Sequence, residues 1–151
     1  MAEVVVPEID DLYYHKRLVE NPKTMSFSEP ISFGEEKWEA FYKAEVDRDP
    51  SEKFLAYIFC DDCMDFTGEI SYKYDEEVGG FLSFILIEAK HRHDGYGKEA
   101  LRLLKLEALN NDIHKFYALL DKSNNDGIRF VEKMGYELVD DQDQLLYMLD
   151  F

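Results

Sequence analysis

The spacing of apolar residues changes period along the chain, and each change predicts a new element of secondary structure. Apolar positions three or four residues apart indicate amphipathic helices, whereas short alternating or continuous apolar runs indicate strands. On this basis we expect helices at residues 8–20, 35–47, 98–111 and 126–134. We expect strands at residues 53–60, 65–74, 80–87, 114–120, 136–139 and 145–149.

The boundaries of these elements carry turn and capping residues. Asn21-Pro22 ends the first helix, and Ser32 and Glu35 have the spacing of a capping box at the start of the second. Asp/Cys and Glu/Gly turns join the first three strands, as in antiparallel hairpins. The chain therefore predicts a mixed α/β fold, with a mostly antiparallel central sheet and helices packed on both faces.

The composition is that of a single folded domain spanning residues 1–151. With 46% hydrophobic and 15% aromatic residues, the chain can bury a core and is not disordered. No apolar run is long enough for a membrane span, and residues 1–7 lack the organisation of a signal peptide. The net charge of −16 argues against nucleic acid, because phosphate backbones require a basic footprint. We expect a cytoplasmic protein with no membrane or nucleic-acid partner.

The feature that points most directly to a ligand is the glycine-containing turn at residues 92–97. It follows an apolar strand and opens directly into the helix expected from Lys98. Gly95 and Gly97 let the backbone turn sharply and leave main-chain N–H groups exposed at a helix N-terminus. Unpaired amides and the positive end of the helix dipole form an anion site that suits phosphate best.

The distribution of charge supports the same site. Between Lys90 and Lys133 there are nine basic and seven acidic residues, a net charge of +2 within a chain of −16. His91 and His93 lie in the same turn. A locally basic segment suits a polyanionic ligand. Ordinary fluctuation of charge along a chain is the alternative explanation.

Cys60 and Cys63 are separated by two aspartates in an expected hairpin turn. A zinc site would need two further ligands and the sequence has no second cysteine pair, so we expect no metal. A redox motif would be expected at the start of a helix within a strand–helix unit, which is not the context here. We therefore interpret the pair as two free thiols.

Two motifs together resemble the GNAT N-acetyltransferase superfamily. Residues 92–97 match the Arg/Gln-x-x-Gly-x-Gly/Ala signature, which lies between a strand and a long helix. Residues 124–136 are similar to the second motif, in which an Asn opens a short helix that ends in Gly-Phe or Gly-Tyr. Gly68-Glu69-Ile70 also resembles the glycine-containing central strand of the family. The resemblance covers residues 53–151 well and the N-terminal third only by the order of its elements, and it implies a GNAT-like fold.

The resemblance implies acetyl-CoA as the acyl donor, with its pyrophosphate on the amides of residues 92–97. The strand before the signature is expected to pair through its backbone with pantetheine, and a bulge there to present an N–H to the thioester. Asn124 is either a helix N-cap or a side-chain contact to the coenzyme. The residues expected to bind the cofactor are Ile85, Leu86, Ile87, Arg92, His93, Asp94, Gly95, Tyr96, Gly97, Lys98 and Asn124.

Amine acetylation requires a neutral amine, a stabilised oxyanion and a proton or its equivalent for the departing thiolate. Many family members place a general-acid tyrosine four residues before the Gly-Phe pair, but this sequence has Val131 there. Tyr96 and Tyr136 lie nearby, and we interpret both as structural. The sequence therefore names no general acid.

Glu69 is the candidate base, because a carboxylate in mid-strand is costly to bury unless it is paired or functional. The alternative, which we favour, is that Glu69 is an outward-facing and solvated side chain, because strand alternation does not tell which face of the strand is covered. Glu88 lies at a strand end next to Lys90, and we interpret it as part of a surface ion pair.

The acceptor is expected to be a primary amine of a small molecule or peptide. The chain after Lys133 has no basic residue, and its acids are Glu137, Asp140, Asp141, Asp143 and Asp150. If this segment borders the acceptor cleft, as the resemblance suggests, it would attract a cationic amine. A solvated acidic surface is the alternative.

Two functions follow from these observations. The first is an acetyl-CoA-dependent N-acetyltransferase, and the second is a coenzyme-A-binding sensor or interaction module that has lost turnover. Val131 at the general-acid position favours the second function, whereas the intact glycine turn fits both. A homodimer is left open.

Overall fold

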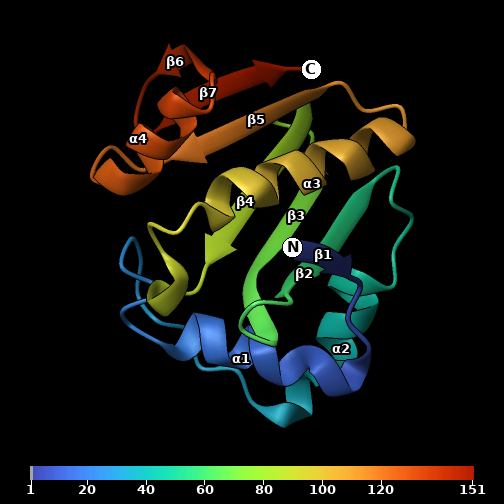
Figure 1. Ribbon diagram of the computed structural model, residues 1–151. Coiled ribbons are helices and arrows are strands. Elements are labelled where there is room, and N and C mark those ends of the chain that lie inside the picture. Colours follow the sequence, from blue (N-terminus) through green and yellow to red (C-terminus); the bar gives the residue numbers. More distant parts are fainter. Residues whose placement is uncertain (1) are drawn as a thin grey trace.

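A computed structural model describes residues 2–151 of the chain. Within these residues, seven strands form one sheet in the order β1-β2-β3-β4-β5-β7-β6 (Figure 1). The pairs in this range are antiparallel except for β4 and β5, which are parallel. The strands are β1 (Ala2–Val5), β2 (Lys53–Cys60), β3 (Asp65–Asp75), β4 (Gly80–Ile87), β5 (Lys115–Leu120), β6 (Glu137–Asp141) and β7 (Leu145–Asp150).

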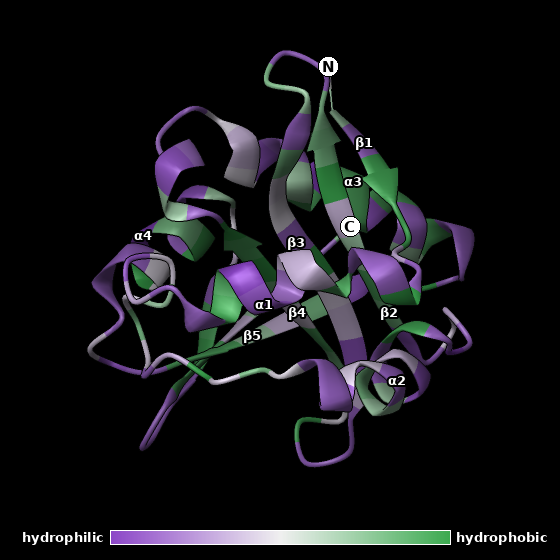
Figure 2. Ribbon diagram, turned by 90° about the horizontal axis from the view of Figure 1, so that it is seen from below, coloured by the Kyte–Doolittle hydropathy of each residue, from purple (hydrophilic) through white to green (hydrophobic). Residues whose placement is uncertain are grey.

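Helices cover both faces of the sheet. The α-helices are α1 (Tyr13–Glu20), α2 (Trp38–Phe41), α3 (Tyr96–Asn110) and α4 (Asn125–Lys133). Short 3-10 segments are η1 (Ile9–Leu12), η2 (Glu35–Lys37) and η4 (Ala89–His91), and η3 (Tyr42–Val46) is a π-helix. In Figure 2 the helices carry both hydrophilic and hydrophobic residues, as expected for elements with one face on a sheet. None of the helices in residues 2–151 combines the length and apolar character needed to cross a membrane.

The central strands contribute to a core on each side of the sheet. On one side, Ile70 and Tyr72 of β3 share a core with Leu104 of α3. On the other side, Tyr57 of β2 shares a core with Tyr14 of α1, and the two ring centroids lie 5.1 Å apart in an edge-to-face arrangement. Burial on both faces explains why β2 reads as a continuous apolar run and not as an alternating one.

The expected fold class is confirmed, and most elements lie where the apolar pattern places them. β2 and β4 have the predicted bounds, and the long helix begins at Tyr96 instead of Lys98. The first expected helix is confirmed as η1 followed by α1. β1 was not predicted; it is short and exists through its pairing with the end of β2, from Ala2–Cys60 to Val5–Tyr57.

The expected helix at residues 35–47 is a succession of η2, α2 and η3. The amide of Asp47 bonds to the carbonyl of Tyr42 at 2.8 Å, five residues back, which is the pattern of a π-helix. Apolar spacing does not distinguish these windings, because each of them brings residues three to five positions apart to the same side of the helix.

Candidate cofactor and acceptor site

Strands β4 and β5 diverge along most of their length. Within residues 2–151 they pair only at Phe81–Phe116 and Leu82–Tyr117, whereas β4 pairs with β3 from Gly80 to Ile87. Figure 1 shows the two strands separating from this junction. We call this divergence the wedge. The β4 edge from Ser83 to Ile87 presents main-chain N–H and C=O groups to the wedge that β5 does not pair.

Side chains close the wedge at its narrow end. Ser83 Oγ donates to the carbonyl of Tyr117 at 3.2 Å, so the Tyr136 hydroxyl donates to Ser83 Oγ at 2.9 Å. Tyr136 is buried, and burial raises its pKa to about 12. Its hydroxyl is therefore engaged in joining the strands, in agreement with a structural role.

The bulge expected in β4 is not observed. The register with β3 continues without a shift from Gly68–Ile87 to Asp75–Gly80, and the irregular pairing lies instead between β2 and β3, at Ile58 and Phe59. Divergence from β5 is sufficient to leave the β4 edge unpaired, so no bulge is needed. Gly68 allows the close pairing of β3 with β4, because a Cβ atom there would lie 2.7 Å from the carbonyl oxygen of Leu86.

The glycine-containing turn follows β4 and η4 and leads into α3. His93 and Gly95 have left-handed backbones, with φ of 69° and 84°. The N-cap residue of α3 is Gly95, which has no side chain to cap the helix. The amide of Glu99 bonds to the Gly95 carbonyl at 3.3 Å. The amides of Tyr96, Gly97 and Lys98 precede this bond, so they have no partner inside α3 and are available to an anion at the helix N-terminus.

Gly97 allows α3 and α4 to meet. A Cβ atom at Gly97 would lie 2.9 Å from Cε1 of Phe130 in α4. The two signature positions thus require glycine for different physical reasons. Gly95 adopts a left-handed φ in open space, and Gly97 leaves room for the Phe130 ring.

The Arg92 side chain braces the turn against the segment that follows α1. Its Nε donates to the Ile87 carbonyl at 3.1 Å, and its two terminal nitrogens donate to the carbonyls of Lys23 and Thr24 at 3.2 and 2.5 Å. The hydroxyl of buried Thr24 accepts a further bond from the amide of Ala89 at 3.1 Å. Burial lowers the pKa of Arg92. The carbonyl oxygens serve as acceptors for its N–H groups. One terminal nitrogen also lies 3.3 Å from Ser26 Oγ, so the guanidinium is engaged by main-chain carbonyls and one hydroxyl of the protein itself.

Asn124 is the N-cap of α4. Its side-chain oxygen accepts a hydrogen bond from the amide of Gly127 at 3.0 Å. The sequence left the N-cap and the coenzyme contact open, and the structure places the side-chain oxygen in the first of these roles.

Glu69 lies on the side of β3 that faces α1 and is not a solvated side chain. Its carboxylate lies 2.7 Å from Nδ1 of His15, and both side chains are only 12–13% exposed. The His15 ring packs between Phe33 and Phe41, with centroids 5.0 and 4.3 Å away. In register, Glu69 lies opposite Leu86 of β4, which places the pair beside the strand that borders the wedge.

Sequence reasoning did not identify His15. The residue lies 54 positions before Glu69 in the chain. Its spacing from Leu12 and Leu18 places it beside the buried face of the first helix, but spacing within a helix does not name a partner on a distant strand. The one signal in the sequence is Glu69 itself, because a carboxylate in mid-strand needs a polar partner when it is buried.

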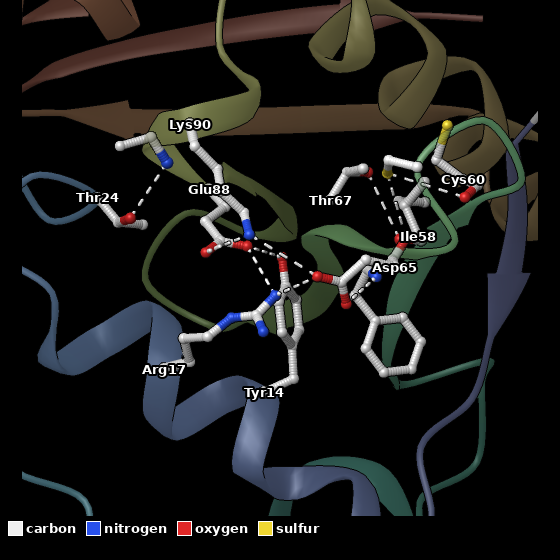
Figure 3. Close-up of polar contacts among 12 residues, drawn as sticks. Tyr14, Arg17, Thr24, Ile58, Cys60, Asp65, Thr67, Glu88 and Lys90 are labelled. Atoms are coloured by element: carbon white, nitrogen blue, oxygen red, sulfur yellow. Dashed lines mark hydrogen bonds and ion pairs between the residues drawn. The ribbon is translucent and has the colours of Figure 1, made fainter.

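Glu88 is buried, which corrects the interpretation of a surface ion pair. It is 5% exposed and accepts hydrogen bonds from the Tyr14 hydroxyl at 3.2 Å and from the Arg17 guanidinium at 3.0 Å (Figure 3). Arg17 also donates to Asp65 at 3.1 Å, and Lys90 lies 4.0 Å from Glu88. Burial raises the pKa of Tyr14, and the nearby carboxylate of Glu88 raises it further. A network centred on the buried Glu88 carboxylate therefore fixes the end of β4 to α1 and β3, a role that only tertiary contacts create.

Val131 belongs to the core that α3 and α4 form on the sheet, and it is 6% exposed. Tyr96, the other nearby tyrosine, has its hydroxyl 3.3 Å from Cys60 Sγ. Val131 thus packs in the core, and the hydroxyls of Tyr96 and Tyr136 each have a partner within the protein. Neither hydroxyl is left unpaired toward the wedge.

The acidic residues after Lys133 do not form one continuous wall. Asp141 lies next to the β6–β7 turn, opposite Leu145, which pairs with the C-terminal end of β5 where the wedge is open. Asp150 lies opposite Lys115, at the end of β5 where the wedge is closed, and the two form an ion pair at 3.6 Å. Asp141 also pairs with Lys122 at 3.0 Å. Only part of the acidic segment therefore borders the open end.

Comparison with known proteins identifies the family. The sequence profile described as an acetyltransferase (GNAT) domain matches residues 5–137. No curated protein sequence matches the chain significantly.

Solved structures show the same fold at low sequence identity. The GNAT domain of S. lividans PAT is 14% identical with a TM-score of 0.79, and the match covers 99% of this chain and 89% of that one. PaiA N-acetyltransferase from Thermoplasma acidophilum, in complex with coenzyme A, is 16% identical with a TM-score of 0.73 and coverage of 100% and 99%. YncA from Salmonella typhimurium, a putative acetyltransferase with its cofactor acetyl-CoA, is 15% identical with a TM-score of 0.76 and coverage of 99% and 94%.

The fold and the profile together define the class as an acyltransferase. Because the profile covers most of the chain, including the wedge and the glycine turn, this protein belongs to the GNAT acetyltransferase family.

Proposed function

We propose that this protein transfers the acetyl group of acetyl-CoA to a primary amine of a small molecule or peptide. The observation that carries the proposal is the wedge, which places an unpaired strand edge next to an uncapped helix N-terminus. Acetyl-CoA has an amide-containing pantetheine arm and a pyrophosphate, and these two groups need strand-like hydrogen bonds and an anion site.

The cofactor is proposed to lie along the wedge. Main-chain groups of Ile85, Leu86 and Ile87 would pair with pantetheine. The amides of residues 93–98 would hold the pyrophosphate, because the amide of Arg92 already bonds to the Ala89 carbonyl at 3.2 Å. Lys98 is exposed in the first turn of α3 and adds positive charge there. Acetyl-CoA bound in this way supplies the activated acyl group, while the protein supplies position and proton transfer.

The chemical step is attack of a neutral amine on the thioester carbon. A new C–N bond forms, the C–S bond breaks, the amine loses a proton and coenzyme A leaves as the thiolate. We propose that the Glu69 carboxylate accepts the amine proton, with His15 at 2.7 Å holding the carboxylate in position and sharing the charge. In the absence of a general-acid tyrosine, the thiolate leaves without a dedicated side-chain donor, because a thiolate is a stable leaving group.

The acceptor is proposed to be cationic before it binds. The chain carries a net charge of −16, and Asp140 and Asp143 lie at or next to the β6–β7 turn, near the open end of the wedge. Such a field concentrates ammonium groups near the site. The ammonium must lose one proton before attack, and this is the proton that Glu69 accepts. The second N–H proton leaves to solvent as the amide forms.

The deciding experiment measures thiol release from acetyl-CoA across a library of primary amines and lysine peptides. Wild-type protein should release thiol with at least one amine, and Glu69→Gln should lower kcat/KM by about 100-fold or more at neutral pH. The difference in kcat/KM between Glu69→Gln and wild type should shrink as pH rises, because a larger fraction of the amine is then already neutral in solution and needs no base. Glu77→Gln, which removes an exposed carboxylate in the β3–β4 turn, is the matched control and should behave as wild type. No thiol release with any amine would contradict the proposal in favour of a binding module.

A further inference from the structure

The two cysteines lie closer to the proposed cofactor site than their sequence context suggests. Cys60 is the last residue of β2 and is 2% exposed, and Cys63 is exposed in the turn that joins β2 to β3. Both are free thiols. Cys63 Sγ lies 3.8 Å from the carbonyl oxygen of Cys60 and 3.9 Å from that of Asp65, so its side chain folds back over the turn toward Cys60.

Cys60 also contacts the cofactor turn directly. Its Sγ lies 3.3 Å from the hydroxyl of Tyr96, the residue between the two signature glycines. The Tyr96 ring packs edge-to-face on His91, with centroids 5.6 Å apart. The tertiary fold thus places a helix N-terminus beside a Cys-x-x-Cys pair across 36 residues of sequence.

The two thiols differ in a way that suits disulfide formation. The hydrogen bond with Tyr96 holds the pKa of Cys60 below its usual value. Partial burial raises the pKa of Cys63, and the adjacent Cys60 raises it further. Cys63 is the accessible thiol and Cys60 is the more easily ionised one.

We propose that Cys60 and Cys63 form a reversible disulfide site whose state is transmitted to the cofactor turn through Tyr96. The oxidant is a low-molecular-weight disulfide such as oxidised glutathione. Cys63 attacks it, forms a mixed disulfide and releases one glutathione thiol. Cys60 then attacks Cys63 Sγ as the thiolate, which closes the internal S–S bond and releases the second glutathione thiol, so that two thiols are oxidised and one disulfide is reduced.

The two cysteines belong to one short hairpin loop, in which Cys60 pairs with Asp65. Cys63 Sγ lies 3.8 Å from the carbonyl oxygen of Cys60, so a change of side-chain rotamers within the loop is the movement that the bond requires. Disulfides in a reducing compartment are transient and regulatory. Cys63 is exposed to reductants, so the bond would be reversible.

Closing the disulfide changes the environment of Tyr96. The Cys60 sulfur shares a hydrogen bond with the Tyr96 hydroxyl at 3.3 Å, whereas a disulfide sulfur has no proton to donate, carries no charge and accepts only weakly. Oxidation therefore weakens the contact of Tyr96 with β2, and the amides of the cofactor turn are held less firmly. This last step rests on the proposed function, because it assumes that the turn binds acetyl-CoA.

The test compares reduced and oxidised protein in two independent measurements. Wild type and Cys63→Ser are incubated with oxidised glutathione, and intact mass identifies an internal disulfide, a mixed disulfide or free thiols. Hydrogen exchange at the amides of residues 93–98 then reports the turn without any ligand. Calorimetry measures the affinity for a coenzyme A analogue that lacks the thiol, so that the ligand cannot reduce the protein.

We expect an internal disulfide in wild type, faster exchange at residues 93–98, and an affinity lower by about three- to tenfold, the size of one lost hydrogen bond. Cys63→Ser should show none of these changes. A wild-type protein that forms no internal disulfide, or whose disulfide leaves the exchange of residues 93–98 unchanged, overturns the inference. If reduced protein binds no coenzyme analogue, the proposed function fails, and the mass and exchange results still decide the inference.

Discussion

Gly97 of α3 and Phe130 of α4 approach so closely that a Cβ atom on Gly97 would lie 2.9 Å from Cε1 of the Phe130 ring. The glycine turn is therefore set both by the ligand it would bind and by helix packing. Any side chain at residue 97 must displace an aromatic ring that contacts the main core.

Gly97→Val should destabilise the protein by about 1–3 kcal/mol and weaken acetyl-CoA binding, because the new side chain pushes α4 away from the turn. The double variant Gly97→Val/Phe130→Ala removes the clash and should recover part of the affinity. Denaturant unfolding and calorimetry measure the two effects. Equal acetyl-CoA affinities for wild type and Gly97→Val would remove the turn as the cofactor site.

Arg92→Lys should loosen the segment after α1. A lysine cannot reach the carbonyls of Ile87, Lys23 and Thr24 together, since it lacks the planar fork of the guanidinium. We expect a loss of about 1–3 kcal/mol in unfolding free energy and faster hydrogen exchange near residues 23–26. Arg102→Lys, which alters an exposed pair with Glu99 in α3, is the control and should change little. Unchanged exchange in Arg92→Lys would contradict the bracing role.

Binding of acetyl-CoA should weaken as salt rises, because the phosphates meet helix amides and a locally basic segment. Acetyl-pantetheine lacks the pyrophosphate, so its weaker binding should depend little on salt. Titrations of both ligands from low to high ionic strength separate the two contributions. A dissociation constant for acetyl-CoA that stays flat would show that the basic segment is not the phosphate site.

Val131→Tyr should not supply the missing general acid. Val131 is 6% exposed within the core, so a phenol there overpacks the contact of α4 with α3 and costs about 1–3 kcal/mol. Thermal unfolding and turnover of the variant test this expectation. Higher turnover at unchanged stability would show that the phenol had reached the thiolate.

Lowering the pH should reduce the stabilisation that the Asp65 carboxylate contributes to the network around Arg17. Burial disfavours the charge on Asp65, but the amide of Phe66 and the Arg17 guanidinium outweigh it and lower the pKa of Asp65 below its usual value. A lowered folded-state pKa means that the stabilisation is present in full above the unfolded pKa of about 4 and is lost as the pH falls through the folded value.

Asp65→Asn should therefore cost about 1 kcal/mol or less at pH 7, since the pair is one-third exposed, and the difference from wild type should shrink below pH 4. Urea unfolding at several pH values measures this difference. Asp61→Asn, an exposed carboxylate in the β2–β3 turn, is the control. A difference that grew toward acid pH would contradict the assignment.

The sequence by itself determined the positions of most helices and strands and of the glycine turn, but not β1 or the windings within residues 35–47. These features depend on residues close together in the chain, where apolar period, proline, glycine and capping residues act locally. The signature at residues 92–97 could be read directly because its chemistry is that of the backbone at a helix start.

The tertiary structure alone decided which side chains meet. His15 and Glu69 are 54 residues apart, Arg17 and Glu88 are 71 apart, and Arg92 and Thr24 are 68 apart. The burial of Glu88 and the divergence of β4 from β5 likewise follow from how elements pack. Local propensity carries no information on these contacts. The sequence of a strand is the same whether its edge is paired or free, and the sequence around a carboxylate is the same whether water or an arginine contacts it.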